Sequence, residues 1–200
     1  MYSYKVTSLV KIILLSLLLT SKTLAASNLT LSVGYGQAAN SEMAAKNLRS
    51  SGLVQKLKFG FLKSNGTLGA SELGFLIGER TLKSNTTHDS ISTSVENKIS
   101  SFGLFYTLYF STFYSQFTYN RNVIKSNIRG NLSQSQRNAV FKIYNLDSGE
   151  TNSDSLEVLI GYKVFELSGA IFNLAVSHSI HQTTTFKETN LLFETKFRFQ

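Results

Sequence analysis

Alternation of apolar and polar residues is the feature that most constrains what this chain can fold into. It recurs in eight segments, at 29–36, 56–61, 72–78, 101–110, 113–120, 156–165, 172–181 and 191–199. A period of two is typical of a β-strand with one apolar face. Most of the segments approach the length that a tilted strand needs to cross a bilayer. The pattern therefore predicts an all-β fold.

The connections between these segments alternate in length. Residues 63–67, 111–112 and 166–169 are short, whereas 37–52, 81–97, 123–153 and 182–187 are longer and polar. Short turns on one side and long loops on the other are typical of membrane barrels. We predict an eight-stranded antiparallel up-and-down transmembrane β-barrel. Two segments depart from the pattern: 139–146 extends the third long loop or forms a ninth strand, and the Ala-rich stretch Ala38–Leu48 favours a short helical turn.

The charged residues of the strands lie on the polar faces, and the centres of the apolar faces carry none. An eight-stranded interior is too narrow for the many phenylalanines, so the apolar faces should look outward at lipid. We therefore predict a lumen filled by a charged network rather than an open pore. Its predicted members are Lys56, Lys58, Glu72, Glu157, Lys163, Glu194, Lys196 and Arg198. The short turns further predict that Lys58 lies opposite Glu72, and Tyr109 opposite Tyr114.

The N-terminus predicts export. Lys5 and Lys11 precede or begin a short apolar run, and Thr23-Leu24-Ala25-Ala26 offers small residues for cleavage. These are the three parts of a secretory signal peptide, and the run is too short to span a membrane as a helix. We predict a signal peptide at 1–25 and a barrel at 26–200. The chain has no cysteine and no proline, which excludes disulfides and suits long strands.

Both ends of the mature chain resemble known barrels. Phe193, Phe197 and Phe199 alternate in the last strand, and this resembles the C-terminal assembly signal of outer-membrane barrels. Residues 33–38, Val-Gly-Tyr-Gly-Gln-Ala, resemble the first strand of OmpX-like and OmpA-like barrels of the small opacity-type family. The resemblance implies the outer membrane of a Gram-negative bacterium. It also implies contact with outer-membrane lipid and lipopolysaccharide, with the barrel-assembly machinery, and with a host or surface ligand through the loops.

Three functions remain open on the sequence. The favoured one is a structural or adhesin-like surface protein without catalysis, metal or cofactor. An alternative is a lipid A deacylase of the PagL type, with His178, Ser179 and Glu188 as weak catalytic candidates. Ser179 points to the opposite face from His178, so a nucleophile there could not reach its base. A narrow pore is the third. Basic loop residues such as Lys125, Arg129 and Arg137 favour lipid headgroups over nucleic acid as a partner.

Overall fold

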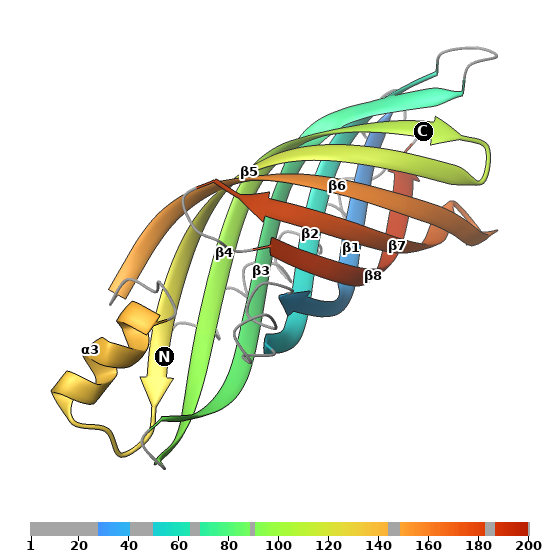
Figure 1. Ribbon diagram of the computed structural model, residues 1–200. Helices are drawn as coiled ribbons and strands as arrows, with labels where there is room; N and C mark the ends of the chain where they lie inside the picture. The colour runs from blue at the N-terminus through green and yellow to red at the C-terminus, as the bar shows by residue number, and fades with distance from the viewer. Residues whose placement is uncertain are drawn as a thin grey trace.

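The computed structural model describes residues 28–40, 50–64, 69–88, 91–143, 149–182 and 187–199. Within them lie eight strands and one helix (Figure 1). The elements are β1 (Leu29–Asn40), β2 (Ser50–Ser64), β3 (Ala70–His88), β4 (Ile91–Phe110), β5 (Phe113–Arg129), α3 (Gln134–Ile143), β6 (Gly149–Leu167), β7 (Ala170–His181) and β8 (Lys187–Phe199). The predicted signal peptide lies outside the described residues and stays a prediction.

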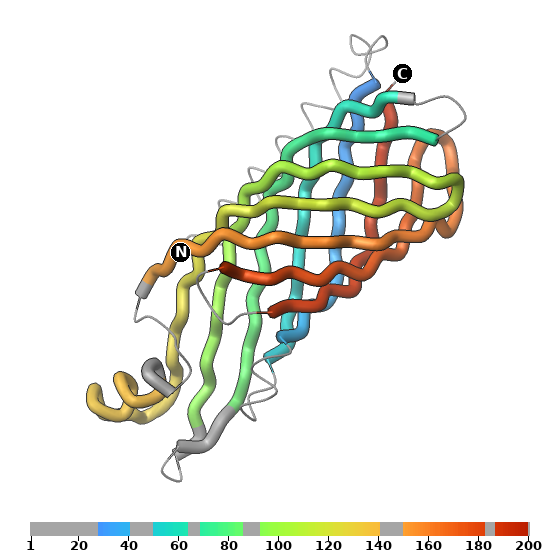
Figure 2. Tube along the Cα trace, turned by 45° about the horizontal axis from the view of Figure 1, so that its top comes forward, coloured from blue at the N-terminus to red at the C-terminus, as the bar shows by residue number. Residues whose placement is uncertain are grey.

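The sheet closes on itself. Each strand pairs antiparallel with its neighbours in sequence, and β8 pairs with β1 (Figure 2). A path through directly opposite residues starts at Leu29, crosses all eight strands and returns to β1 at Ala39, so it is displaced from position 29 to position 39. This stagger of the register tilts the strands by about 40°. The predicted eight-stranded up-and-down barrel is confirmed.

The two ends of the barrel differ. We name the end with the tight turns at Ser111–Thr112 and Ser168–Gly169 the turn end, and the opposite end the loop end. Ser168 and Gly169 both have positive φ, at 47° and 83°. Two such residues make the primed turn that matches the twist of paired strands, and glycine adopts it without strain. Leu29 and Phe199, at the free ends of β1 and β8, pair at the turn end.

At the loop end the strands are longer than predicted. Most of the predicted loop 81–97 is a hairpin of β3 and β4, and β5 continues to Arg129. The outward residues here become polar, so the hydrophobic alternation fades although the ladder continues. Of Ala38–Leu48, residues 38–40 belong to β1 and the others lie outside the described residues. We call residues 79–88, 91–100 and 121–143 the extension; both figures show it projecting beyond the other strands.

The possible ninth strand at 139–146 is wrong where the structure describes it, because residues up to Ile143 belong to α3. The helix begins with a capping box. The Ser133 N–H donates to Gln136 Oε1 at 2.9 Å, and the Gln136 N–H donates to Ser133 Oγ at 3.4 Å. This reciprocal pair satisfies N–H groups that the first helical turn leaves free. The Ser-x-x-Gln spacing of Ser133 and Gln136 is a sequence signal for the start of a helix. The strand-like alternation that follows it pointed instead to a strand.

Candidate functional site

The outer surface of the barrel wall is an apolar belt. Large side chains point away from the lumen on every strand, and Leu104, Ile160 and Phe193 are 51, 63 and 66% exposed. The lumen side holds the buried polar groups instead. A surface of this kind is stable only in lipid, where a closed ladder also satisfies every backbone group. The chain therefore spans a membrane as a β-barrel. Among the described residues, no helix is long and apolar enough to cross a membrane.

One strand departs from the predicted faces. The register of β6 against β7 shifts between Lys163 and Phe165, which marks a bulge. A bulge inserts one residue and so reverses the phase of the side chains beyond it. Phe165 is odd-numbered like the predicted lumen residues Glu157 and Lys163, yet it is 51% exposed and stacks on Phe172 with ring centroids 4.4 Å apart.

The lumen is crossed by buried ion pairs. Lys56 on β2 pairs with Glu157 on β6, and Lys196 on β8 pairs with Glu72 on β3. Lys58 lies 2.7 Å from Glu194, and Arg80 lies 2.7 Å from Glu188. All eight side chains are at most 5% exposed. Each pair joins strands that are not neighbours, so the charges neutralise one another across the barrel interior.

Two tyrosines support this network. The Tyr114 hydroxyl donates to Glu194 at 2.5 Å, and the Tyr109 hydroxyl donates to Glu72. The two tyrosines are directly opposite in the ladder, as predicted, with ring centroids 5.6 Å apart. The predicted pairing of Lys58 with Glu72 is wrong, because Lys58 faces Leu76 in the register. The register pairs Ser64 with Ala70, so the hairpin is not centred on Asn65 as the prediction assumed.

Small residues make room for these side chains. The strand glycines lie on the lumen side, and a Cβ built on Gly161 would overlap the Tyr114 ring. A Cβ on Gly60 would likewise overlap the Glu72 carboxylate. An eight-stranded barrel encloses only enough space for side chains. The glycines therefore decide which charged and aromatic groups the lumen can hold.

The structure brings six of the eight predicted lumen residues together and leaves two at the rim. Lys163 lies beside the bulge and pairs with Glu166 at 3.3 Å, with its side chain 38% exposed. Arg198 is exposed at the turn end. Sequence reasoning missed Arg80, although it continues the even-numbered phase of Glu72. The part of the lumen nearer the loop end also holds Asn120, Asn122 and His181, all of them buried.

The three catalytic candidates lie on both sides of the wall. His178 points outward, where its Nδ1 lies 3.2 Å from Thr189 Oγ1. Ser179 and Glu188 are buried in the lumen. The wall between them prevents the base from reaching the nucleophile, as the alternation implied.

A second set of catalytic residue types lies within the lumen itself. His181 Nδ1 lies 3.4 Å from Ser153 Oγ, and its Nε2 lies 3.2 Å from Glu188 Oε1. All three side chains are buried, and Glu188 is already neutralised by Arg80. This cluster resembles a hydrolase triad in composition, but among the described residues all three side chains are buried and hydrogen-bonded to one another or paired with Arg80.

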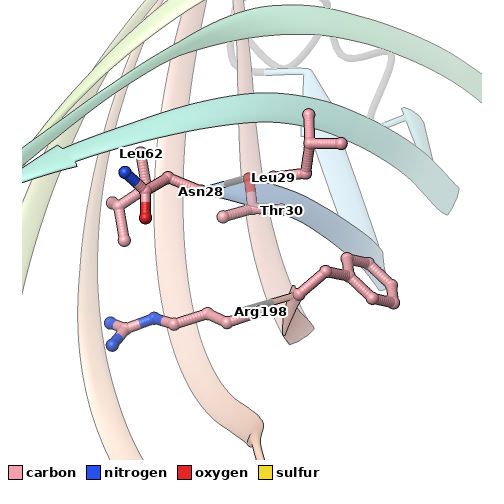
Figure 3. Close-up of a pocket in the computed structure, with 6 residues that line it drawn as sticks. Asn28, Leu29, Thr30, Leu62 and Arg198 are labelled. Carbon is pink, nitrogen blue, oxygen red and sulfur yellow. The ribbon is translucent and has the colours of Figure 1, made fainter. Parts of the chain in front are cut away.

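A small pocket lies at the turn end, where β1, β2 and β8 meet (Figure 3). It is lined by Asn28, Leu29, Thr30, Leu62, Arg198 and Phe199. Its volume is about 40 Å³, which is close to the space of one water molecule. The pocket is too small for an organic substrate. Among the described residues, no group of three His, Cys, Asp or Glu could hold a metal ion.

The extension has an apolar interior that is continuous with the lumen, because the same buried cluster includes Val54, Leu159 and Leu192 of the barrel. Its inward side chains pack with Leu132 and with Val140 of α3 in a buried cluster that includes Leu82, Val95, Ile99, Ile124 and Ile128. Arg137 fixes the chain between β5 and α3. Its guanidinium donates to the carbonyl oxygens of Ile128 at 2.9 Å, Gly130 at 3.2 Å and Leu132 at 3.4 Å. Arg137 is thus a structural residue rather than a free surface charge.

The outward face of the extension carries both signs of charge. Lys98 lies 2.7 Å from Glu79, and Lys125 lies 2.8 Å from Glu150. Glu96 is shared by Lys83 at 3.7 Å and Arg129 at 3.5 Å. Exposed pairs of this kind contribute little to stability. Their position just beyond the apolar belt makes them candidates for contact with lipid headgroups or a surface partner.

Comparison with known proteins gives similarity in fold alone. No protein-family model and no curated protein sequence matched the chain. Among solved structures, Neisserial surface protein A is 11% identical with a TM-score of 0.48, covering 86% of this chain and 98% of that one. The attachment invasion locus protein Ail of Yersinia pestis, in complex with the heparin analogue sucrose octasulfate, is 12% identical with a TM-score of 0.47, covering 86 and 97%.

The outer membrane protein OprG from Pseudomonas aeruginosa is 10% identical with a TM-score of 0.45, covering 87% of this chain and 98% of that one. These similarities carry no inference about function.

Proposed function

We propose that this chain is an outer-membrane barrel of a Gram-negative bacterium that acts as a surface-interaction protein through its extension. One observation carries the proposal. Strands β3 to β6 continue beyond the apolar belt, and α3 packs on an apolar cluster of the extension that is continuous with the lumen. A rigid scaffold that presents an exposed segment is the usual arrangement for recognition. The loop end then faces the outside of the cell, and both termini face the periplasm.

The lumen supports this reading over the alternatives. A diffusion pore needs a continuous path, whereas buried ion pairs and tyrosines fill the middle of this barrel. A lipid A deacylase needs a nucleophile and base on the same face, and His178 and Ser179 lie on opposite faces. Adhesin-like binding needs neither. The nearest contacts of the barrel are outer-membrane lipid and lipopolysaccharide.

Export and assembly complete the proposal. A signal peptide at 1–25 would deliver the chain to the periplasm. The exposed Phe193 and Phe197, with Phe199, would present the assembly signal on β8 to the barrel-assembly machinery. A ligand on host cells or on neighbouring bacteria would then meet the extension. Nucleic acid is not among the proposed partners.

The test replaces residues 130–148 by a short glycine-serine turn and expresses the variant on cells. Adhesion to epithelial monolayers and self-aggregation should fall to the level of cells without the protein. The variant should still migrate as a heat-modifiable folded barrel, because the eight-strand ladder and the lumen ion pairs lie outside the replaced residues. A matched control changes the turn Ser168–Gly169 to Asn-Gly at the opposite end and should keep adhesion. Full adhesion by the 130–148 variant would contradict the proposal.

Lipid A composition distinguishes a non-catalytic surface protein from a lipid A deacylase. His178→Ala and Ser153→Ala should each leave the mass spectrum of lipid A unchanged relative to the wild-type strain. If wild-type cells contain a lipid A species that lacks one acyl chain, and this species disappears in either variant, the protein is a deacylase instead.

A further inference from the structure

Two lysines on the outward face of the extension are directly opposite each other. Lys98 on β4 pairs with Lys125 on β5 in the register. Directly opposite residues in an antiparallel ladder have Cα atoms about 4.5–5.5 Å apart. Like charges at such positions destabilise the pairing. Lys98 forms an ion pair with Glu79 on β3, and Lys125 forms one with Glu150 on β6, so the two partners lie on opposite sides of the lysine pair. An anion between the two lysines would relieve their repulsion.

A third cation lies below this pair on the same face. Arg121 is exposed and lies directly opposite Asp154 of β6 in the register, although no ion pair within 4.0 Å joins Arg121 to any described residue. It faces Phe102 in the ladder and stands four residues before Lys125. Between the three cations lies the exposed Ser100, opposite Val123. The positions of Arg121, Ser100, Lys98 and Lys125 therefore adjoin on the wall of β4 and β5, and Asp154, Glu79 and Glu150 flank them. We call the first four residues the β4–β5 cation cluster.

The height of this cluster matches a headgroup layer. Phe102 and Tyr119 are the last aromatic residues of the apolar belt on these two strands, and both are exposed. Lys98 stands four residues beyond Phe102, which is about 13 Å along the strand and about 10 Å along the membrane normal after the tilt. The polar layer of a bilayer extends about 5–8 Å beyond its hydrocarbon edge. Arg121, two residues beyond Tyr119, thus lies within this layer, and the backbone of the two lysines lies beyond its outer edge.

We propose that the β4–β5 cation cluster binds the phosphate groups of outer-leaflet lipid. Arginine and lysine donate charge-assisted hydrogen bonds to phosphate oxygens, and the Ser100 hydroxyl can donate a further one. Lipid is favoured over a soluble phosphate because Phe102 and Tyr119, directly below, offer an apolar surface to the acyl chains of the same molecule. The proposal rests on the outward orientation of the loop end given above.

Native mass spectrometry of the full barrel in neutral detergent tests the site, with diphosphoryl lipid A as the probe. Wild-type protein should retain this lipid, and Arg121→Gln should weaken binding about fivefold. The double variant Lys98→Gln/Lys125→Gln should weaken it by about fivefold for each cation removed. The same lipid A after phosphatase treatment should bind wild type and variants equally weakly. The matched control, Lys63→Gln/Lys163→Gln, removes two charges at the turn end and should bind as wild type does.

The outcomes separate the sources of phosphate. Competition by excess inorganic phosphate at ordinary ionic strength would show that the site takes free phosphate, which overturns the lipid assignment. Equal binding by Arg121→Gln and wild type would overturn the site itself, and this variant breaks no ion pair needed for folding. Heat-modifiable migration checks that each variant is folded. Loss of adhesion on deleting 130–148 is measured independently, so failure of the lipid site and failure of the proposed function are distinguishable.

Discussion

Glycines in the strands leave space for large side chains in the lumen. The Tyr114 ring lies where a Cβ on residue 161 would stand, and the Tyr114 hydroxyl donates to Glu194. We expect Gly161→Ala to displace this ring and destabilise the barrel by about 1–3 kcal/mol, because overpacking forces side chains from their preferred rotamers. Urea unfolding in lipid vesicles measures the change. Gly78→Ala is the control, since a Cβ there meets nothing closer than 3.4 Å. Equal stability of the two variants would contradict the overlap.

Buried charge gives a second prediction at this scale. Glu157→Gln leaves Lys56 charged and without its partner in the lumen, where both side chains are at most 1% exposed. Removing one partner of a buried ion pair costs about 3–5 kcal/mol. The double variant Lys56→Met/Glu157→Gln removes both charges and should recover most of the loss. Guanidinium unfolding of the two variants compares them, and no recovery in the double variant would show that the charges do not act as a pair.

Lipid contact gives a third. Leu104 lies on the outward face near the middle of the belt and is 51% exposed. Leu104→Arg should cost about 2–4 kcal/mol, the range for a cation at the bilayer midplane. Thr107→Ser, a small change on the buried lumen face, should cost far less. Folding titrations in vesicles measure both. A larger loss for Thr107→Ser would reverse the assignment of the two faces.

At the scale of elements, the boundary between strand and loop was the hardest feature to predict. The alternation located all eight strands because lipid demands apolar residues on one face. Beyond the belt this demand ends, so the hairpin of Lys83 and Glu96 was predicted as loop although it continues the ladder. The bulge beside Lys163 could not be predicted from the alternation either. One inserted residue shifts the phase of the side chains but gives no distinctive residue type to recognise it by. Lumen partners such as Lys58 and Glu194 depend on the stagger of the closed sheet, which no single segment contains.

The helix α3 depends on one side chain for its position. Arg137 donates to three carbonyl oxygens where β5 ends and the chain turns toward the helix. We expect Arg137→Ala to loosen α3 while the barrel stays folded, because the freed carbonyls lose their charged donor. Hydrogen exchange should rise across 130–143 and remain unchanged in β1. Arg129→Ala, which removes only an exposed pair with Glu96, should leave exchange in α3 as in wild type. Equal exchange in both variants would remove this role from Arg137.

On the scale of the whole molecule, closure depends on the one seam that joins the two ends of the chain. β1 pairs with β8 from Leu29–Phe199 to Asn40–Glu188. Deleting residues 191–200 removes most of this seam and leaves unpaired backbone groups in lipid, which is costly for each group. The truncated chain should yield no heat-modifiable folded band after transfer into vesicles. A truncated barrel that inserted and resisted heat would show that another pairing closes the sheet.

The ion pairs that cross the lumen also have a mechanical consequence. A closed ladder strongly resists stretching around its circumference, but a thin sheet bends easily about its strands, so an empty tube would flatten under lateral pressure. Lys56 and Glu157 stand on β2 and β6, four strands apart in a ring of eight, and hold opposite walls at a fixed separation. Arg80 and Glu188 do the same between β3 and β8, closer to the loop end. Such cross-braces keep the cross-section round when the barrel is compressed laterally, and with it the relative positions of β3, β4 and β5, from which the extension continues.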